Sequence, residues 1–112
     1  MSLPFVEGSL TRIDDKTLSF KLVNYVGTGS ATVRIRVLMD GEDVTSKTKV
    51  RIGSEERSIT QPMVVYSSYG ENIEFIISSD KPIPAGKHKF RVEISVESPI
   101  WTTITTEFEG EA

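Results

Sequence analysis

The sequence predicts an all-β protein with the architecture of an antiparallel immunoglobulin-like β-sandwich of seven or eight strands. Apolar and polar residues alternate with a period of two along residues 87–96 and again along residues 33–40, as expected for strands with one buried face. Short β-rich runs separated by polar turns recur along the whole chain, whereas no amphipathic helical pattern of useful length occurs. The length of 112 residues fits one domain covering residues 1–112.

The first half of the chain contains four expected strands. Residues 5–13 form a first candidate that a glycine interrupts, and residues 17–25 form a second one with its larger apolar side chains on one face. A flexible glycine-rich loop at 27–30 precedes the third strand at 33–39. An Asp-Gly-Glu-Asp sequence then indicates a hairpin turn, after which residues 44–52 form a weaker strand.

The second half begins with an ambiguous segment, residues 57–66. It is rich in β-forming residues but contains Pro62, so we expect either an edge strand or part of a long connection. The expected elements after it are a strand at 73–78, a proline-rich connection at 82–86, a strand at 87–96 and a threonine-rich last strand at 101–108. Residues 109–112 are expected to be a frayed acidic tail.

Composition excludes several classes of function. The net charge of -3 and the pI near 5.2 argue against a nucleic-acid-binding protein, and the absence of cysteine rules out disulfides and thiolate metal sites. No run is long and apolar enough to span a membrane, and no secretory signal precedes the first expected strand. We therefore expect a cytoplasmic protein if Met1 is the natural start, and an extracellular one if the chain is an excised domain.

The sequence offers no convincing catalytic or metal site. His88 is the only histidine, and it shares the side of Phe90 at the start of a strand, away from any recognisable nucleophile. Residues 40–43 do not match the twelve-residue calcium loop, and no lysine follows residues 27–29 at the offset of a phosphate loop. We therefore predict that the protein is not an enzyme and has neither a cofactor nor a metal.

Basic residues are predicted to gather on one outer face of the sandwich. In an immunoglobulin-like order, the third, fourth and penultimate strands are neighbours in one sheet, and many of their outward positions are basic. The candidate partner-binding residues are Arg34, Arg36, Lys47, Lys49, Arg51, Lys89 and Arg91, with Trp101 at the border. Such a face would attract an acidic protein surface, anionic lipid or an acidic glycan. The alternative is a solvated sheet face with interleaved glutamates and lysine-lined edges.

A second group of candidates consists of residues that fall outside the regular alternation, namely Met63, Tyr66, Tyr69 and Trp101. Exposed aromatic side chains are favoured as anchors of protein interfaces. The same residues could equally pack beneath loops.

Three stretches occur together in a fixed order: Val6-Glu7-Gly8-Ser9-Leu10, then Tyr25-Val26-Gly27 with residues 37–44, then Tyr69-Gly70-Glu71 with residues 83–92. This order resembles the small β-subunit of C-glycoside deglycosidases and its uncharacterised relatives. The resemblance implies a β-sandwich that assembles with a larger barrel subunit of the sugar-phosphate-isomerase type, which carries the metal and the catalysis. It implies no catalytic residue in this chain.

A broader resemblance rests on Asn24 with its glycine-rich loop, the Asp-Gly-Glu hairpin and the stretch at residues 84–90. These features are similar to immunoglobulin-like adhesion modules of bacterial and archaeal surface proteins and to soluble domains of archaellum accessory proteins. We therefore predict a non-catalytic accessory or interaction domain that docks to a larger protein, such as a sugar-metabolising barrel enzyme. The alternative is an extracellular adhesion or surface-appendage assembly module. We expect a protein partner, with a homo-oligomer as a further option, and no nucleic acid.

Overall fold

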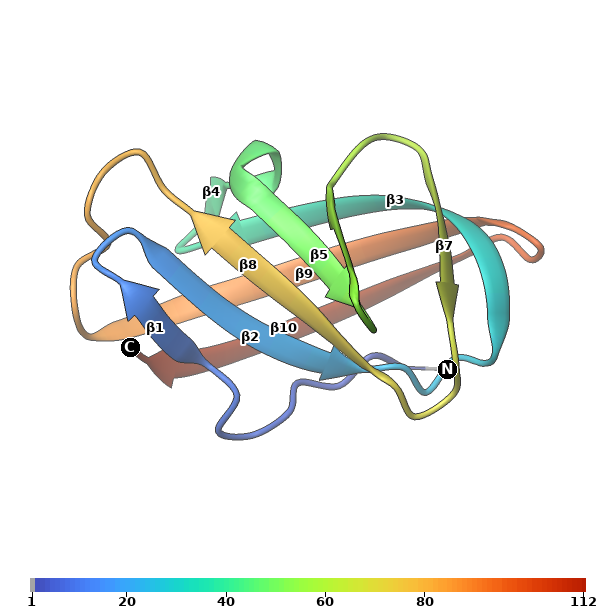
Figure 1. Ribbon diagram of the computed structural model, residues 1–112, viewed down its shortest axis with the longest axis horizontal. Helices are drawn as coiled ribbons and strands as arrows, with labels where there is room; N and C mark the ends of the chain where they lie inside the picture. Colours follow the sequence, from blue (N-terminus) through green and yellow to red (C-terminus); the bar gives the residue numbers. More distant parts are fainter. Residues whose placement is uncertain (1) are drawn as a thin grey trace.

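The computed structural model describes residues 2–112 and consists of two antiparallel β-sheets packed face to face (Figure 1). The first sheet contains, in spatial order, β1 (Thr11–Asp14), β2 (Thr17–Val23), β8 (Asn72–Ser78), β5 (Thr48–Ile52) and β6 (Glu55–Ser58). The second sheet contains β10 (Thr102–Glu111), β9 (Lys87–Ser98), β3 (Gly29–Met39) and β4 (Glu42–Asp43), and β7 (Met63–Ser67) also pairs with β3. The predicted fold class, an antiparallel immunoglobulin-like β-sandwich, is confirmed, but the described residues form ten strands where the sequence predicts seven or eight.

The strand boundaries differ from the sequence prediction at several places. β3 begins at Gly29, within the segment expected to be a flexible loop at 27–30. The first strand begins at Thr11. The described residues before it form no strand, but they run along β2 through an isolated bridge between Phe5 and Leu22 and through backbone hydrogen bonds such as that from the Val6 amide to the Lys21 carbonyl (2.9 Å). The ambiguous segment divides into the end of β6, a corner at Pro62 and the whole of β7 except its last residue. The chain also forms a short 3-10 turn, Thr45–Lys47, before β5.

The prediction of a frayed C-terminal tail is wrong. β10 continues to Glu111, and the backbones of Ala112 and Gly86 exchange two hydrogen bonds of 3.1 Å. The tail is held because β9 is twelve residues long and offers paired positions as far as Lys87.

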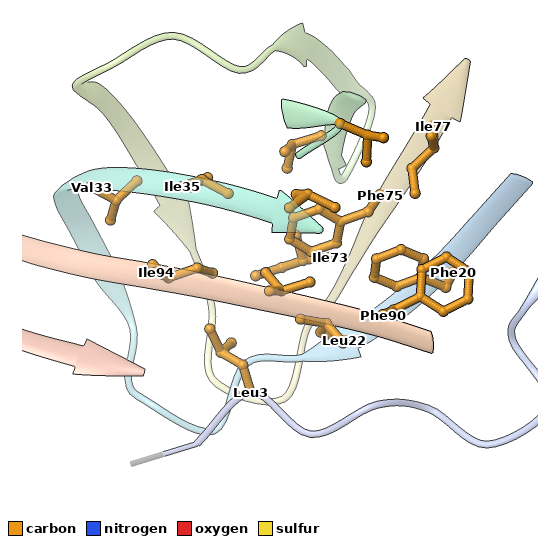
Figure 2. Packing of buried hydrophobic residues seen from close by; sticks show 14 of the residues in the cluster. Leu3, Phe20, Leu22, Val33, Ile35, Ile73, Phe75, Ile77, Phe90 and Ile94 are labelled. Atoms are coloured by element: carbon orange, nitrogen blue, oxygen red, sulfur yellow. The ribbon is translucent and has the colours of Figure 1, made fainter. Parts of the chain in front are cut away.

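Alternate side chains of the two sheets point toward each other and form the core. Phe90, Val92, Ile94 and Val96 of β9 are buried, as the period-two pattern predicts, and Figure 2 shows Phe90 and Ile94 packed among side chains from the facing sheet. The buried residues at the centre of the core with no exposed surface are Leu18, Phe20, Leu22, Val37, Phe75 and Ile77.

The phenylalanines form one connected cluster within this core. The Phe20 ring on β2 lies 5.3 Å from Phe75 on β8 and 5.4 Å from Phe90 on the opposite sheet, measured between ring centroids. Phe108 on β10 stacks on Phe90 at 5.0 Å and on Phe5 at 3.9 Å. Aromatic pairs in such geometries contribute about 0.5–1.5 kcal/mol each beyond their buried area, so the cluster holds the two sheets together.

Candidate interaction surfaces

The structure divides the predicted basic face between the two sheets. The expectation that the third, fourth and penultimate strands share one sheet is wrong for the fourth, because β5 pairs with β8 and β6 and not with β3. Of the basic residues predicted to bind a partner, those on the β3–β9 sheet are Arg34, Arg36, Lys89 and Arg91. Those on β5 and the turn before it are Lys47, Lys49 and Arg51. The two sets therefore lie on different sheets.

Each of these basic side chains also has a carboxylate partner within 4.0 Å. The pairs on the β3–β9 sheet are Arg34–Glu97, Arg36–Asp43, Arg36–Glu93, Lys89–Glu109, Arg91–Glu93 and Arg91–Glu107. Those around β5 are Lys47–Asp80, Lys49–Glu56 and Arg51–Glu74. Strand register produces several of them, since Arg36 lies opposite Glu93 and Arg91 lies opposite Glu107. These glutamates neutralise much of the positive charge that the sequence pattern emphasises.

Exposed aromatic and aliphatic side chains gather instead at one end of the sandwich. Three connections lie there, and we call them together the loop end: the β2–β3 loop (24–28), the β7–β8 turn (68–71) and the β9–β10 turn (99–101). Figure 1 shows this end on the side of the N-terminus and away from the C-terminus. Ile100 and Trp101 are 69% and 70% exposed, and the Tyr69 ring lies 5.5 Å from that of Tyr25.

Asn24 holds two of these connections together. The Nδ2 group of its buried side chain lies within hydrogen-bond distance of the carbonyls of Gly27 (2.8 Å) and Ser68 (3.0 Å) and of Ser67 Oγ (3.0 Å), which share its two hydrogens. Its Oδ1 accepts from the amides of Val26 (2.9 Å) and Gly27 (3.3 Å). One amide side chain therefore satisfies backbone groups in both the β2–β3 loop and the β7–β8 turn, which gives the exposed tyrosines a fixed support.

The loop end carries almost no charge. Residues 24–30, 67–70 and 98–104 contain no Asp, Glu, Lys or Arg, although such residues make up 26% of the chain. Tyr, Trp, Ser, Thr and Gly dominate these stretches, a composition that resembles that of antibody-type binding loops. A surface of this kind favours an uncharged, partly apolar ligand surface over a charged one.

Two hollows accompany the loop end. The β2–β3 loop and the β9–β10 turn line an open groove of about 220 Å³, with Val26 on one side and Pro99 and Ile100 on the other. A largely apolar cavity of about 100 Å³ lies between the sheets near the same loop, among side chains that include Leu3 and Ile104. The groove gives a partner side chain a place to enter beside the exposed Ile100.

The predicted anchors outside the alternation have different positions. Trp101 and Tyr69 belong to the loop end, and Tyr66 is 61% exposed on β7. Met63 is buried in the core, so this residue is packed inside the protein and is not an exposed interface anchor. Sequence reasoning missed Ile100 and the contribution of Tyr25, although the uncharged composition of the loops was a signal that could have identified them.

The single histidine lies at the opposite end of the sandwich. His88 is buried at the start of β9 on the side of Phe90, with Nδ1 2.6 Å from Asp40 Oδ2 and Nε2 2.6 Å from the Pro84 carbonyl. Burial is the largest single effect and opposes charge, but these hydrogen bonds and the attraction of Asp40 outweigh it, and the pKa of His88 is raised.

Two classes of feature are absent from residues 2–112. No group of three or more His, Cys, Asp or Glu side chains there is placed to hold a metal ion. No helix in the same residues has the length and apolar character needed to cross a membrane.

Comparison with known proteins supports the fold. The chain is similar to a subunit of the archaellum periplasmic stator protein complex FlaF and FlaG from Sulfolobus acidocaldarius, with a TM-score of 0.52 and 15% identity over 96% of this chain and 89% of that one. It is also similar to the archaellum periplasmic stator protein FlaG from the same organism, with a TM-score of 0.51 and 15% identity over 96% and 98%. No protein-family model and no curated protein matches the sequence. The shared feature is the β-sandwich architecture.

Proposed function

We propose that this protein is a non-catalytic assembly module that docks through its loop end onto an uncharged surface of a protein partner. The observation that carries the proposal is the placement of Tyr25, Tyr69, Ile100 and Trp101 on an end whose three connections contain a single charged residue, Glu71. Large exposed aromatic anchors beside small polar residues are typical of interface centres, where a few side chains supply most of the binding energy.

A protein surface fits the loop end better than the other partners suggested by the sequence. Anionic lipid or an acidic glycan would require basic side chains, and residues 24–30, 67–70 and 98–104 have none. The similar FlaF and FlaG proteins are described as parts of a periplasmic stator complex, which supports an assembly role in a surface structure. The resemblance to a deglycosidase subunit gains no such support, so we favour the surface-assembly alternative.

The basic residues of the β3–β9 sheet define a narrower second proposal. Arg36, Lys89 and Arg91 would act in binding only if a partner displaced their glutamates, because each is already ion-paired. Binding through the loop end and binding through this sheet face predict different effects of mutation.

Site-specific photo-crosslinking in the native cells tests the proposal. A photoreactive amino acid at Tyr69 or Trp101 should yield an adduct with one defined protein. The same photoreactive amino acid placed at position 51, where Arg51 lies on the outer face of β5, should yield no such adduct. The partner so identified should then bind the purified protein at least about tenfold more weakly after Trp101→Ala, as expected for a central aromatic anchor.

The triple variant Arg36→Glu, Lys89→Glu and Arg91→Glu serves as the matched comparison. Unchanged affinity of this variant, together with the loss caused by Trp101→Ala, supports the loop end. Loss of binding only in the charge-reversed variant would reject the loop end in favour of the sheet face. Adducts that contain only lipid would reject a protein partner altogether.

A further inference from the structure

The outer edge of β7 differs from the other edges of the two sheets. β7 pairs with β3 on one side only and has the sequence Met-Val-Val-Tyr-Ser, without a charged residue. The other terminal strands described by the structure, β1, β4, β6 and β10, all contain Asp, Glu or Arg. Charged side chains on edge strands hinder pairing with another chain, and β7 lacks this protection.

Backbone hydrogen bonds of β3 show which groups of β7 face outward. The amide of Ile35 donates to Gln61 Oε1 (3.0 Å) and the carbonyl of Val37 accepts from the amide of Val44 (2.9 Å), so both residues direct their backbone groups away from β9. Alternation along the strand directs the backbone groups of every second residue before Ile35 the same way, toward β7. Those residues are Gly29, Ala31 and Val33, paired with Ser67, Val65 and Met63.

Val64 and Tyr66 therefore direct their backbone amides and carbonyls away from β3. The position of Arg57 on β6 agrees with this assignment, because its guanidinium donates to the Val64 carbonyl. Neither backbone group of Tyr66 has a turn or loop partner among residues 2–112. Elsewhere on this side of the sheet, the side chains of Gln61 and Thr45 accept hydrogen bonds from backbone amides of β3, those of Ile35 and Val37. The outer edge of β7 is consequently the part left open, with Arg57 as its cap.

A hollow with a mixed polar and apolar lining adjoins the open edge. A groove of about 280 Å³ lies between β7 and the β5–β6 hairpin of the facing sheet. Its lining combines apolar Val50, Ile52, Met63 and Val65 with polar and charged residues that include Ser54, Glu55, Arg57 and Glu71. An additional strand beside β7 would place its inward side chains over this groove.

We propose that β7 pairs in antiparallel fashion with β7 of a second copy of this chain, with the two Val65 residues opposite each other at the two-fold axis. In this register Val64 faces Tyr66 of the second copy, and each such pair exchanges two backbone hydrogen bonds. The same register sets a β-branched side chain against an aromatic one on the outer face, a favourable cross-strand pair. Val65 of the second copy lies over this groove, beside its apolar residues Met63 and Val65.

The occupant is a second copy because the edge is complementary to itself. No charge on β7 repels the same strand in another molecule, and the two-fold register uses both outward residues of each chain. Five-residue strands bury a small interface, so the dimer is weak and reversible and forms independently of the loop end.

Sedimentation velocity over about a hundredfold range of protein concentration should show a reversible monomer–dimer equilibrium. Tyr66→Pro removes the outward amide without removing a β3 hydrogen bond, and two lost hydrogen bonds per dimer should weaken dimerisation about thirtyfold. Tyr66→Ala keeps the amide and is the matched control, with a smaller effect. Val64→Lys, at a residue 58% exposed, should also reduce dimerisation while leaving the fold intact.

Arg57→Ala provides a change in the opposite direction. Removal of the cap frees the Val64 carbonyl and should strengthen the dimer, and the amide protons of Val64 and Tyr66 should exchange more slowly at high protein concentration. A monomer at every concentration, or a dimer unaffected by both Tyr66→Pro and Val64→Lys, would overturn the proposal. A dimer lost only after Trp101→Ala would assign self-association to the loop end and equally reject pairing through β7.

Discussion

His88 and Asp40 form a charged pair that ties the start of β9 to the β3–β4 turn. The Pro84 carbonyl can only accept, so His88 Nε2 donates to it, and the Asp40 carboxylate accepts from Nδ1. Both ring nitrogens are then donors, which is the arrangement of a protonated imidazole. The second Asp40 oxygen accepts from the Lys89 amide at 2.9 Å. Asp40 itself adopts a φ of 53°, a conformation that the turn requires.

The pair predicts a stability that depends on pH in a defined window. Burial opposes charge on Asp40, but its bonds to His88 and to the Lys89 amide dominate and lower its pKa, whereas the pKa of His88 is raised. Asp40 contributes its full stabilisation of the fold above its ordinary pKa of 3.8, and His88 contributes its full stabilisation below its ordinary pKa of 6.5. Stability should fall as the pH rises through the folded pKa of His88 and as it drops through that of Asp40.

Asp40→Asn isolates this effect, because asparagine tolerates a positive φ and keeps the turn. The melting temperature of the variant should lie below that of the wild type near pH 5–6, and the difference should shrink above the folded pKa of His88. Thermal melts at several pH values measure the difference, and NMR titration of the imidazole should show a lower pKa in the variant. A difference that stays constant with pH would contradict the charged pair.

Asn24→Ala should destabilise the protein by about 2–3 kcal/mol. The substitution leaves partly buried donors and acceptors in the β2–β3 loop and the β7–β8 turn without their partner, and the cost of about 1–3 kcal/mol for a buried unsatisfied group is reduced here by access of water. Urea denaturation measures the loss. Thr28→Ala, which removes one exposed hydrogen bond to the Tyr69 amide, is the control and should cost less than about 1 kcal/mol. Equal losses in the two variants would argue against a central role of Asn24.

Local sequence patterns predicted the strands well and their partners poorly. The alternation of apolar and polar residues in β3 and β9 predicts which side chains are buried, because successive side chains of a strand point to opposite faces of the sheet. The sheet to which β5 belongs depends on pairing with β8, a strand more than twenty residues away, and no residue in β5 encodes that choice. The basic residues that the sequence places on one face therefore lie on two different sheets. The neutralising glutamates also depend on register, which only the folded chain reveals.

The loop end was accessible to sequence reasoning only in part. Tyr69 and Trp101 were identified as candidates because they interrupt the alternation. Their proximity to Tyr25 and Ile100 arises from three connections far apart in the chain, which the Asn24 hydrogen bonds and the groove beside Ile100 bring together. The scarcity of charge in the three connections, with Glu71 as the single charged residue, is visible in the sequence, but its significance emerges once they share one end of the sandwich.

Deletion of residues 109–112 should destabilise the protein, in contrast to the expectation of a frayed tail. The truncated chain loses the last three paired positions of β10 and the hydrogen bonds between Ala112 and Gly86. With a net value of about 0.5–1.5 kcal/mol for each hydrogen bond, partly offset by the entropy of the released residues, we expect a loss of about 1–3 kcal/mol. Chemical denaturation of the truncated and full chains makes the comparison, and identical midpoints would show that the tail is not held in solution.

Charge reversal at Arg36, Lys89 and Arg91 should change stability only modestly despite the number of ion pairs involved. These side chains are 42–75% exposed, and exposed ion pairs contribute about 0–1 kcal/mol each. Reversal also places like charges beside Glu93, Glu107 and Glu109, so the loss should be larger at low salt than at high salt. Denaturation at two ionic strengths tests this, and a loss independent of salt would point to packing of the side-chain stems instead.

Phe20 should be the most sensitive position in the core. Its ring has no exposed surface and contacts Phe75 in its own sheet and Phe90 and Phe108 in the facing one, so truncation opens a cavity between the sheets. Phe20→Ala should cost about 3–5 kcal/mol, a large part of the stability of a domain this size. Phe20→Leu keeps most of the volume and should cost clearly less, which keeps the test usable if the alanine variant unfolds.

Phe5→Ala is the control, because Phe5 is only partly buried and stacks on Phe108 alone. A smaller loss at Phe20 than at Phe5 would show that the cluster does not hold the two sheets together.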